Sequence, residues 1–504
     1  MNSFWIESTK DKLKLNSLKK DVVSDVCIIG GGIFGLSTGY YLSEKGLKVV
    51  VLDKENIAEK VSGNTTGKIT SQHGIIYKYL VDSFSVDYAK QYLEANEDAI
   101  KNIENIIKKE NIECDFCMQD NYVYTKDENL IKKIKDENDI VNKLGFKSEF
   151  VTEIPLRQNI LGAIKFPNQA QFHPRKYCLG LAEKIIENSG EIYINSTVYN
   201  VNKDEGNYIV FTKNNKVKSK YIVFASHYPF INVPGFYFSK MYQSTSYIIA
   251  VDTKTELEDG MYINEESPTY SFRTLKDGNR KLLLIAGSDH KTGSKIDLSN
   301  AYKNLEQKAK ELYKKSEVLY RWNAEDCITL DKIPYIGEFS HFTPNMYIGT
   351  GFNKWGITNS NVAANIITNK ILGKSNKNEE VFKSTRFHPI KNKGELGNVL
   401  KEATNSIIIN KFKIKYKDIE QIKNDEGHVI EKDGEKIGIY KDIDGNIHAV
   451  NPICTHLGCL LSWNNVDKTW DCPCHGSRFN FEGKNIYDPA IGNLKPINLQ
   501  IIDM

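Results

Sequence analysis

The 504-residue sequence lacks any apolar run that approaches the roughly 18 residues a membrane-spanning helix requires. Residues 1–20 carry charges throughout, which does not fit the apolar core of a secretory signal peptide. The formal net charge is only +3, and basic pairs such as Lys108-Lys109 fit solvated helix faces rather than a nucleic-acid-binding patch. We therefore expect a cytoplasmic protein with no membrane span and no nucleic-acid partner.

Internal repeats are also absent, and the shares of hydrophobic residues (40%) and charged residues (26%) are those of a globular protein. A chain of this length exceeds what one hydrophobic core usually organises, so we expect two or three domains. From Ile407 on, short strand-like runs alternate with turns such as Asp433-Gly434. This pattern predicts a small all-β domain at the C-terminal end.

Cysteine is sparse except in one C-terminal region. Cys114 and Cys117 have the spacing of a thioredoxin-like redox pair, but they follow a long helical stretch instead of opening a helix after a strand. We interpret them as a buried pair and keep the redox role as the alternative. Four of the nine cysteines lie between residues 454 and 474, and the others are scattered: Cys27, Cys114, Cys117, Cys178 and Cys327.

Two short loops rich in cysteine and histidine hold most of the chemistry of this C-terminal region. The first reads Cys454-Thr-His456-Leu-Gly-Cys459, and the second reads Cys472-Pro-Cys474-His475-Gly-Ser477. Two thiolates and two imidazoles suit either a tetrahedral zinc ion or a 2Fe-2S cluster in which two histidines replace two cysteines on one iron. The second cysteine of each loop bears on the choice between these two centres.

The two loops closely resemble those of a Rieske domain, over about residues 406–504. The pattern is Cys-x-His, a spacer and Cys-x-x-His, and cytochrome bc-type members add one cysteine per loop, joined in a disulfide. The resemblance implies that Cys454 and Cys472 bind one iron of a 2Fe-2S cluster, that His456 and His475 bind the other, and that Cys459 is bridged to Cys474. A zinc ribbon has no use for the flanking cysteines, so the resemblance favours the cluster. Such a bridge is unusual for a cytosolic chain.

High-potential Rieske proteins place a serine and a tyrosine hydroxyl near the cluster, in a Gly-Ser-x-Tyr sequence. This chain reads Gly476-Ser477-Arg478-Phe479, so the phenol is missing. Hydrogen bonds to the cluster sulfurs stabilise the extra negative charge of the reduced form. We therefore expect a reduction potential below that of the respiratory type.

Near the N-terminus the sequence predicts a nucleotide-binding turn. The buried strand Val26–Ile29 leads into a segment containing Gly30, Gly32 and Gly35, then a helix and a second strand that ends in Asp53. Glycines let the backbone approach a pyrophosphate, the helix N-terminus favours its charge, and the acid accepts from a ribose hydroxyl. The unit therefore predicts dinucleotide binding without choosing between FAD and NAD.

Further motifs resemble the D-amino-acid-oxidase-like family of FAD oxidoreductases, over about residues 22–373. They are the small-residue loop 62–68, the segment Asp331–Gly337, the strand Met346–Gly349 and the turn that follows it. The resemblance implies FAD, which we expect to be non-covalent because Cys327 is out of register with the attachment site of some relatives. By motif, the adenosine diphosphate part would contact Gly30, Gly32, Gly35, Asp53 and Val198. The pyrophosphate and flavin would contact Thr65, Thr66, Gly67 and Lys68. The flavin would also be covered by Gly351, Phe352, Trp355, Gly356 and Ile357.

The resemblance also implies an interleaved architecture. We expect an α/β FAD-binding Rossmann-like domain, interleaved with an α+β substrate domain whose mixed sheet covers the flavin, and then a small all-β Rieske domain. The expected boundaries are 1–90, 165–235 and 320–373 for the FAD domain, 91–164 and 236–319 for the substrate domain, 374–405 for a linker and 406–504 for the Rieske domain.

The function implied is an FAD-dependent oxidoreductase that oxidises a C–N bond of a small amine or amino acid. Electrons would pass between FAD and the 2Fe-2S cluster, with an external electron carrier as a further partner. Arg273 resembles a family position near bound substrate and could pair with a carboxylate, although a structural arginine is an equal alternative. His73, His227 and Lys354 are further catalytic candidates, and for each of them the structural role is the stronger alternative.

Two other functions remain open from the sequence. One is a reductase in which electrons run from the cluster to the flavin. It would not be fed by NAD(P)H, because the sequence has no second glycine-rich dinucleotide motif. The other is a non-catalytic redox or iron sensor, against which the intact flavin motifs argue.

Overall fold

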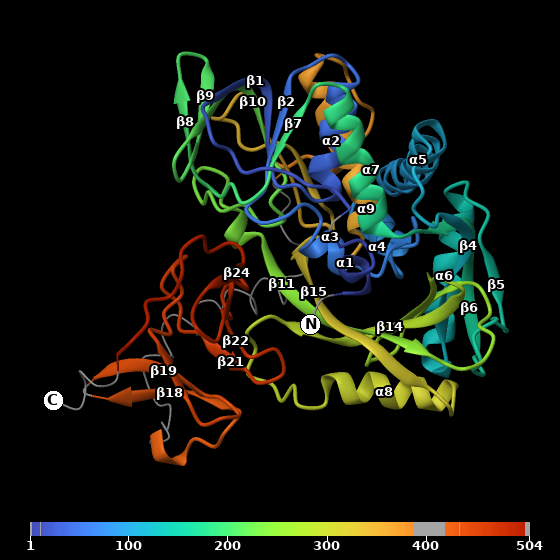
Figure 1. The fold of residues 1–504 in the computed structure, drawn as a ribbon. Coiled ribbons are helices and arrows are strands. Elements are labelled where there is room, and N and C mark those ends of the chain that lie inside the picture. Colours follow the sequence, from blue (N-terminus) through green and yellow to red (C-terminus); the bar gives the residue numbers. More distant parts are fainter. Residues whose placement is uncertain (1–2, 11, 387–418, 433, 499–504) are drawn as a thin grey trace.

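The computed structural model describes residues 3–10, 12–386, 419–432 and 434–498 (Figure 1). These residues form two large sheets, surrounded by helices, and two small sheets at the C-terminal end. Within the described part of the chain, no helix is both long and apolar enough to cross a membrane. The sequence of residues 395–403 favours a short helix and that of residues 412–416 favours a strand, but both segments lie outside the described residues.

The first large sheet has eight strands and is mostly parallel, in the order β16-β17-β10-β1-β2-β7, with β8 and β9 attached through β10. All four residues of β2 are apolar and buried, as expected for a parallel strand covered on both faces. Its strands are β1 (Val22–Ile29), β2 (Val49–Leu52), β7 (Glu191–Tyr193), β8 (Val198–Asp204), β9 (Asn207–Thr212), β10 (Lys216–Phe224), β16 (Tyr335–Glu338) and β17 (Met346–Thr350).

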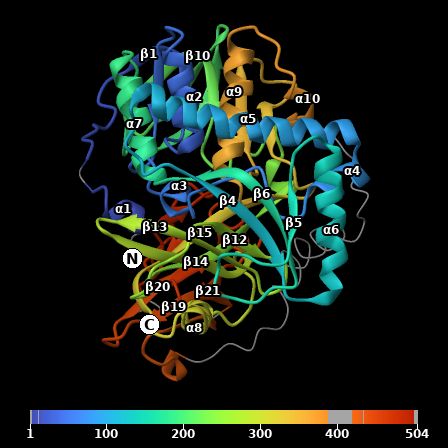
Figure 2. The ribbon, with the colours of Figure 1, turned by 90° about the vertical axis from the view of Figure 1, so that its right-hand side faces the viewer.

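Helices α2, α7 and α9 pack side by side against this sheet, and the long helix α5 crosses them (Figure 2). Helix α5 has nine buried residues that recur at helical spacing, and its N-cap is Ser85, whose side chain accepts from the Tyr88 amide. The helices of this layer are α2 (Ile33–Ser43), α5 (Val86–Glu110), α7 (Pro174–Glu187) and α9 (Gly356–Ile371).

The second large sheet has nine strands in the order β15-β11-β14-β13-β12-β4-β6-β3, with β5 on β6. It is mixed, because β12 pairs with β4 in parallel while the other pairs are antiparallel. Its elements are β3 (Lys68–Ile69), β4 (Cys117–Thr125), β5 (Glu149–Val151), β6 (Gly162–Gln171), β11 (Met241–Asp252), β12 (Met261–Asn264), β13 (Tyr270–Asp277), β14 (Arg280–Lys291) and β15 (Glu317–Thr329), with helices α4 (Tyr77–Ser83), α6 (Glu128–Lys143) and α8 (Ala301–Leu312).

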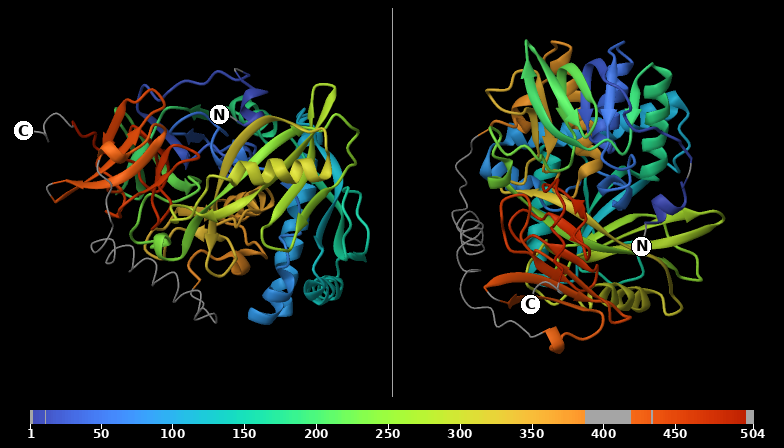
Figure 3. Two further views of the ribbon diagram at one scale, coloured as in Figure 1. Left: turned by 90° about the horizontal axis from the view of Figure 1, so that it is seen from below. Right: turned by 60° about the vertical axis from the view of Figure 1, so that its left-hand side comes forward.

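The C-terminal region folds into a three-stranded and a four-stranded antiparallel sheet. Figure 3 shows it seated against the second large sheet and below the first. Its strands are β18 (Glu426–Lys432), β19 (Glu435–Lys441), β20 (Ile447–Val450), β21 (Ser462–Asn464), β22 (Thr469–Asp471), β23 (Arg478–Asn480) and β24 (Asn485–Tyr487), preceded by the short helix η3 (Ile419–Gln421).

Short segments complete the two large parts. Helix α1 (Phe4–Glu7) buries Phe4 and Trp5 close to α3 (Val61–Asn64) and α7, and η1 (Tyr237–Ser239) precedes β11. Residues 374–386 fall within the expected linker, and the short helix α10 (Glu379–Phe382) within them contacts β16. Arg386 then makes a buried bidentate ion pair with Asp331 at 2.8 Å.

The predicted fold class is confirmed: an α/β part and a part with a mixed sheet are interleaved along the chain and followed by a small all-β part. The largest cluster of buried apolar side chains runs through both interleaved parts, from Val26 in β1 to Ile164 in β6. The exact domain boundaries stay a prediction.

Candidate flavin cavity and iron–sulfur centre

The glycine-rich turn between β1 and α2 has the backbone geometry that the nucleotide motif requires. Gly30 has a φ of +115°, and a Cβ there would lie 2.4 Å from the Ala225 carbonyl oxygen. A Cβ on Gly35 would lie 1.9 Å from the Gly30 carbonyl oxygen, so only glycine lets α2 pack this close to the turn. Gly32 is the N-cap of α2 and has no capping side chain, and the Ile33 N–H at the start of the helix donates to the Ser62 hydroxyl at 3.0 Å.

A cavity of about 330 Å³ opens beside this turn. The Asp53 carboxylate lies at its wall and accepts hydrogen bonds from the backbone N–H groups of Gly31 (2.7 Å) and Glu55 (2.9 Å). Burial nevertheless raises the pKa of Asp53. The predicted contacts that line the cavity are Gly30, Gly32, Asp53, Thr65, Thr66, Lys68, Val198, Phe352, Trp355, Gly356 and Ile357, whereas Gly35, Gly67 and Gly351 are not in the lining.

Three side chains donate hydrogen bonds to the backbone of the loop that contains Thr65 and Thr66. No local sequence pattern predicted this role for them. The indole N–H of Trp5 donates to the Thr65 carbonyl at 2.7 Å, and that of Trp322 donates to the Asn64 carbonyl at 2.9 Å. Arg273 donates to the Gly67 carbonyl at 2.6 Å. Three side-chain donors therefore fix the backbone of this loop.

Two of the catalytic candidates lie outside the cavity lining. Arg273 is buried, and its guanidinium also donates to the carbonyls of Phe172 and Thr274, so it is positioned to hold backbone and not a substrate carboxylate. His73 is buried, bonded to the Tyr92 hydroxyl at 2.7 Å, and its ring stacks on Trp355 at 4.9 Å. Both side chains support residues at the edge of the cavity.

The other two candidates do line the cavity. Lys354 forms an ion pair with Asp289 at 2.8 Å. His227 lies with Nε2 3.3 Å from the sulfur of Cys327, and burial lowers its pKa to about 4, so its ring is neutral at physiological pH. Asp326 lines the cavity, whereas its neighbour Cys327 lies on the opposite face of β15 and does not.

The four metal-binding candidates come together in the C-terminal region. Cys454 and Cys472 are buried, and a hydrogen bond from Cys472 lowers the pKa of the Cys454 thiol. The rings of His456 and His475 lie 5.0 Å apart, and both Nδ1 atoms are buried without a partner among the described residues. Two thiols and two orphaned ring nitrogens are the donors that a Rieske cluster takes, so these residues fit the group and would hold it.

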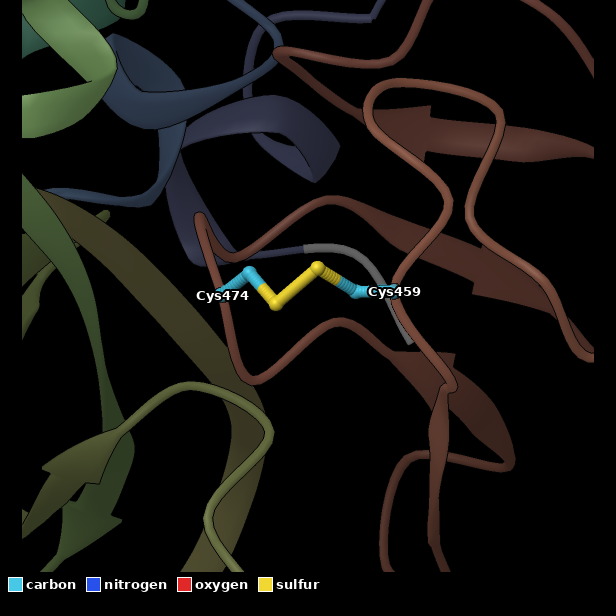
Figure 4. Close-up of a disulfide and its surroundings, with 2 residues drawn as sticks. All are labelled: Cys459 and Cys474. Carbon is cyan, nitrogen blue, oxygen red and sulfur yellow. A yellow bond between two sulfur atoms is a disulfide. The ribbon is translucent and has the colours of Figure 1, made fainter. Parts of the chain in front are cut away.

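A disulfide joins the two loops, between Cys459 and Cys474, the pair that the resemblance implied (Figure 4). The sulfurs of Cys459, Cys472 and Cys474 all lie within 4.8 Å of one another, so the bridge lies directly beside the ligand set. Cys114 and Cys117, in contrast, are both free thiols. Cys114 is buried, as expected, and burial raises its pKa, whereas Cys117 is only half-buried and accepts hydrogen bonds from the side-chain amides of Gln119 and Gln171. The expected buried pair is therefore buried at one cysteine and not at both.

The outer shell of the centre includes a residue of the first large part. His456 Nε2 lies 2.7 Å from the side-chain oxygen of Asn232, so the ring is oriented from outside its own domain. Ser477 accepts from the Ala490 amide at 3.0 Å and its hydroxyl helps to lower the pKa of Cys454. Phe479 is fully buried in the same apolar cluster as the four cysteines.

Replacing Phe479 by tyrosine tests the outer-shell prediction. A phenol that donates to a cluster sulfur stabilises the reduced form, so Phe479→Tyr is expected to raise the potential by some tens of mV, where about 59 mV is a tenfold change in the equilibrium. The measurement is an EPR-monitored redox titration of the whole protein, with Phe481→Tyr, outside that apolar cluster, as the matched control. No upward shift in the Phe479→Tyr protein would contradict the prediction.

The C-terminal region docks through a buried charge network centred on Arg478. Arg478 pairs with Glu325 of β15 at 2.6 Å, with Asp467 at 2.7 Å and with Asp471 at 3.0 Å, and its side chain is 1% exposed. Glu325 also accepts from the hydroxyl of Thr245 at 2.9 Å. Burial raises the pKa of Glu325 to about 7 even though Arg478 opposes this shift.

Close backbone packing completes this interface. A Cβ on Gly476 would lie 2.4 Å from Gln243 Cβ, and one on Gly293 would lie 2.5 Å from the Pro473 nitrogen. The amide of Gln243 donates to the carbonyls of His475 (3.2 Å) and Asp488 (2.6 Å). Residues 486–488 and Ile491 in turn line the cavity beside the glycine turn, so one cavity is walled by both ends of the chain.

Comparison with known proteins agrees with this geometry. Residues 25–370 match the DAO family, described as FAD dependent oxidoreductase, and residues 413–498 match the Rieske [2Fe-2S] domain. The Bacillus subtilis protein YhfW, which carries the name of a Rieske 2Fe-2S iron-sulfur protein, is 35% identical over 497 residues, covering 99% of this chain and 97% of its own. Gamma-glutamylputrescine oxidoreductase of Escherichia coli is 22% identical over 74% of this chain and 89% of its own.

Solved structures share the fold of the first two parts. Glycine oxidase from Geobacillus kaustophilus superposes with a TM-score of 0.62 at 17% identity, over 73% of this chain and 100% of its own. L-proline dehydrogenase from P. horikoshii superposes with a TM-score of 0.61 at 18% identity, over 73% of this chain and 98% of its own. The family matches imply FAD and a 2Fe-2S cluster as cofactors, and the chain belongs to the DAO family of FAD-dependent oxidoreductases, with a Rieske domain following its flavoprotein part.

Proposed function

We propose that the protein oxidises a C–N bond of a small amine or amino acid and that electrons pass between FAD and the Rieske cluster. The bound flavin would supply two-electron chemistry on the substrate, and the cluster would carry one electron at a time. The proposal includes a cytoplasmic location and an external electron carrier as a partner. The names of the relatives, an oxidoreductase of gamma-glutamylputrescine among them, support this class of substrate.

One observation carries the electron-transfer part of the proposal, namely the cavity wall that the Rieske region shares with the flavin motifs. Asp488 lines the cavity and pairs with Lys54, the residue after Asp53, at 3.0 Å. The side-chain amide of Gln243 donates to both the Asp488 carbonyl and the carbonyl of His475, a candidate cluster ligand. No mobile tether is needed to bring the two sites together, because they already share this wall.

The residues of the chain have defined tasks in this proposal. The glycine turn and the loop behind Thr65 position the cofactor, and Trp5 and Trp322 keep that loop in place. Asn232 orients His456 from the flavoprotein side. Arg478 holds the Rieske region against β15 through its buried ion pairs with Glu325 and Asp471.

The test is an anaerobic experiment on protein that contains both cofactors. N-methylated amines, amino acids and polyamines are added one at a time, and a substrate is expected to bleach the flavin first and then produce the EPR signal of the reduced cluster. Dithionite-reduced protein sets the full size of that signal. Bleaching with a permanently oxidised cluster would refute the transfer step, and a panel with no bleaching at all would refute the substrate class.

A further inference from the structure

One carboxylate in the cavity has no partner. Asp326 lies on β15 with its side chain on the same face as Ala324, and both residues line the cavity. Among the residues that the structure describes, Asp326 forms no ion pair and its carboxylate accepts no hydrogen bond. The other charged side chains of the lining are all engaged: Lys54 with Asp488, Lys60 with Glu55, Glu59 with Arg175, Lys354 with Asp289, Lys68 with the Tyr262 carbonyl and Asp53 with two backbone N–H groups.

Asp326 lies at the flavin end of the cavity and not at the adenosine end. The charges that act on it are those of Lys354 and Asp289, and Lys354 lies between Phe352 and Trp355, two of the residues expected to cover the flavin. Burial raises the pKa of Asp326 to about 6, so the group is ionised at neutral pH while it is poorly solvated. Asp326 is partly buried, and an unpaired carboxylate in such a position is costly unless a cation or a set of donors fills the space beside it.

The same cavity offers little to an anionic substrate. Among the described lining residues there is no arginine, the side chain that best holds a carboxylate through two parallel hydrogen bonds. Arg273 is occupied by backbone carbonyls, and Lys354 is already paired. The balance of charge that faces a ligand at this end is therefore negative.

We propose that Asp326 binds an ammonium group of the substrate, so that the enzyme takes a cationic amine in preference to an amino acid held by its carboxylate. The inference rests on the proposed function, because it names the substrate class of that same cavity. An amine group entering the cavity would exchange its water for the Asp326 carboxylate, and a carboxylate entering the same position would meet a like charge.

The experiment uses protein that contains both cofactors and two probes with the same carbon chain, 1-aminobutane and butanoate. Binding is read from the change in flavin absorbance, with no turnover required. Wild-type protein is expected to bind the amine about tenfold or more tightly than the carboxylate, and Asp326→Asn is expected to weaken amine binding by about tenfold to a hundredfold, the range for a hydrogen bond to a charged group.

The control variant is Glu317→Gln, which removes an exposed carboxylate from the far end of the same strand and is expected to change nothing. FAD content and thermal unfolding show whether Asp326→Asn retains the fold, and Asp326→Glu, which keeps the charge, is expected to restore part of the affinity. Equal or tighter binding of butanoate by wild-type protein, an Asp326→Asn protein that binds the amine unchanged, or no response to the amine at all would each overturn the inference.

The outcome for amine binding can be distinguished from the outcome for the proposed function. Amine binding through Asp326 without bleaching by any amine or amino acid would remove the proposed function and leave the binding site. Bleaching by amino acids alone, with no amine binding, would leave the proposed function and remove the inference.

Discussion

Protein with serine in place of Cys472 is expected to contain no iron–sulfur cluster, whereas protein with serine in place of Cys459 is expected to assemble one and lose it more readily. Cys472 is fully buried beside Cys454, and a serine oxygen is a poor substitute for a thiolate at an iron that shares sulfide. Cys459 is not among the expected ligands, and its disulfide with Cys474 joins the two loops across 15 residues of sequence.

A disulfide that closes a loop of this length stabilises a fold by about 3 kcal/mol in the chain-entropy account. Its loss should therefore speed cluster release without preventing assembly. The measurements are iron and acid-labile sulfide per chain, followed by the decay of visible absorbance with time. Cys117→Ser, which changes a free thiol away from the centre, is the matched control. Equal cluster loss in the Cys459 and Cys472 variants would show that the ligand assignment is wrong.

The second large effect is expected from Arg478→Leu. Removing the cation leaves Glu325 and Asp471 buried without their charge partner, and breaking a buried pair in this way costs about 3–5 kcal/mol. The cluster should still assemble, because Arg478 is not a ligand, but the Rieske region should detach from β15. Electron transfer between the flavin and the cluster would then slow, since the shared wall is lost.

Two measurements on the Arg478→Leu protein test these expectations. Denaturant unfolding monitored by the absorbance of the cluster reports the loss of stability, and stopped-flow reduction reports the rate at which the cluster follows the flavin. Arg321→Leu is the control, because Arg321 lies on β15, the strand of Glu325, in a partly exposed pair with Glu306, where a surface ion pair contributes about 0–1 kcal/mol. The double change Arg478→Leu with Glu325→Leu should recover part of the stability. Similar losses in the Arg321 and Arg478 variants would contradict a special role for the buried network.

The sequence predicts the parts of this molecule that are determined by neighbours along the chain. The turn at Gly30 and Gly35 is local, because strand, helix and acid follow one another within a short segment, and the Cys454 and Cys472 loops are local for the same reason. The disulfide partner of Cys459 follows from a family pattern, and the structure has the same pair. A short continuous apolar run predicted the strand at Val26–Ile29, and short runs separated by turns predicted the strands near the C-terminal end.

Pairings between residues far apart in the sequence cannot be predicted in this way. Arg478 and Glu325 are 153 residues apart, and neither differs locally from a charged residue on an exposed strand. Asp326 looks the same in the sequence, since alternation along β15 does not reveal which face meets a cavity. Arg273 illustrates the opposite case: a family position suggested a substrate contact, but its guanidinium is saturated by backbone carbonyls that only the folded chain brings near it.

The cavity wall formed by residues 486–491 has a consequence for how the protein is made. These residues leave the ribosome after the flavoprotein part, and residue 491 follows residue 373, the end of that expected part, by 118 positions (491 − 373). At about 5–20 residues per second, translation needs roughly 6 to 24 s to cover that distance. During this interval a nascent flavoprotein part has its glycine turn and its supporting tryptophans but not its last wall. Synthesis from the N-terminus therefore gives FAD a period of open access, which ends when the iron–sulfur region emerges and docks.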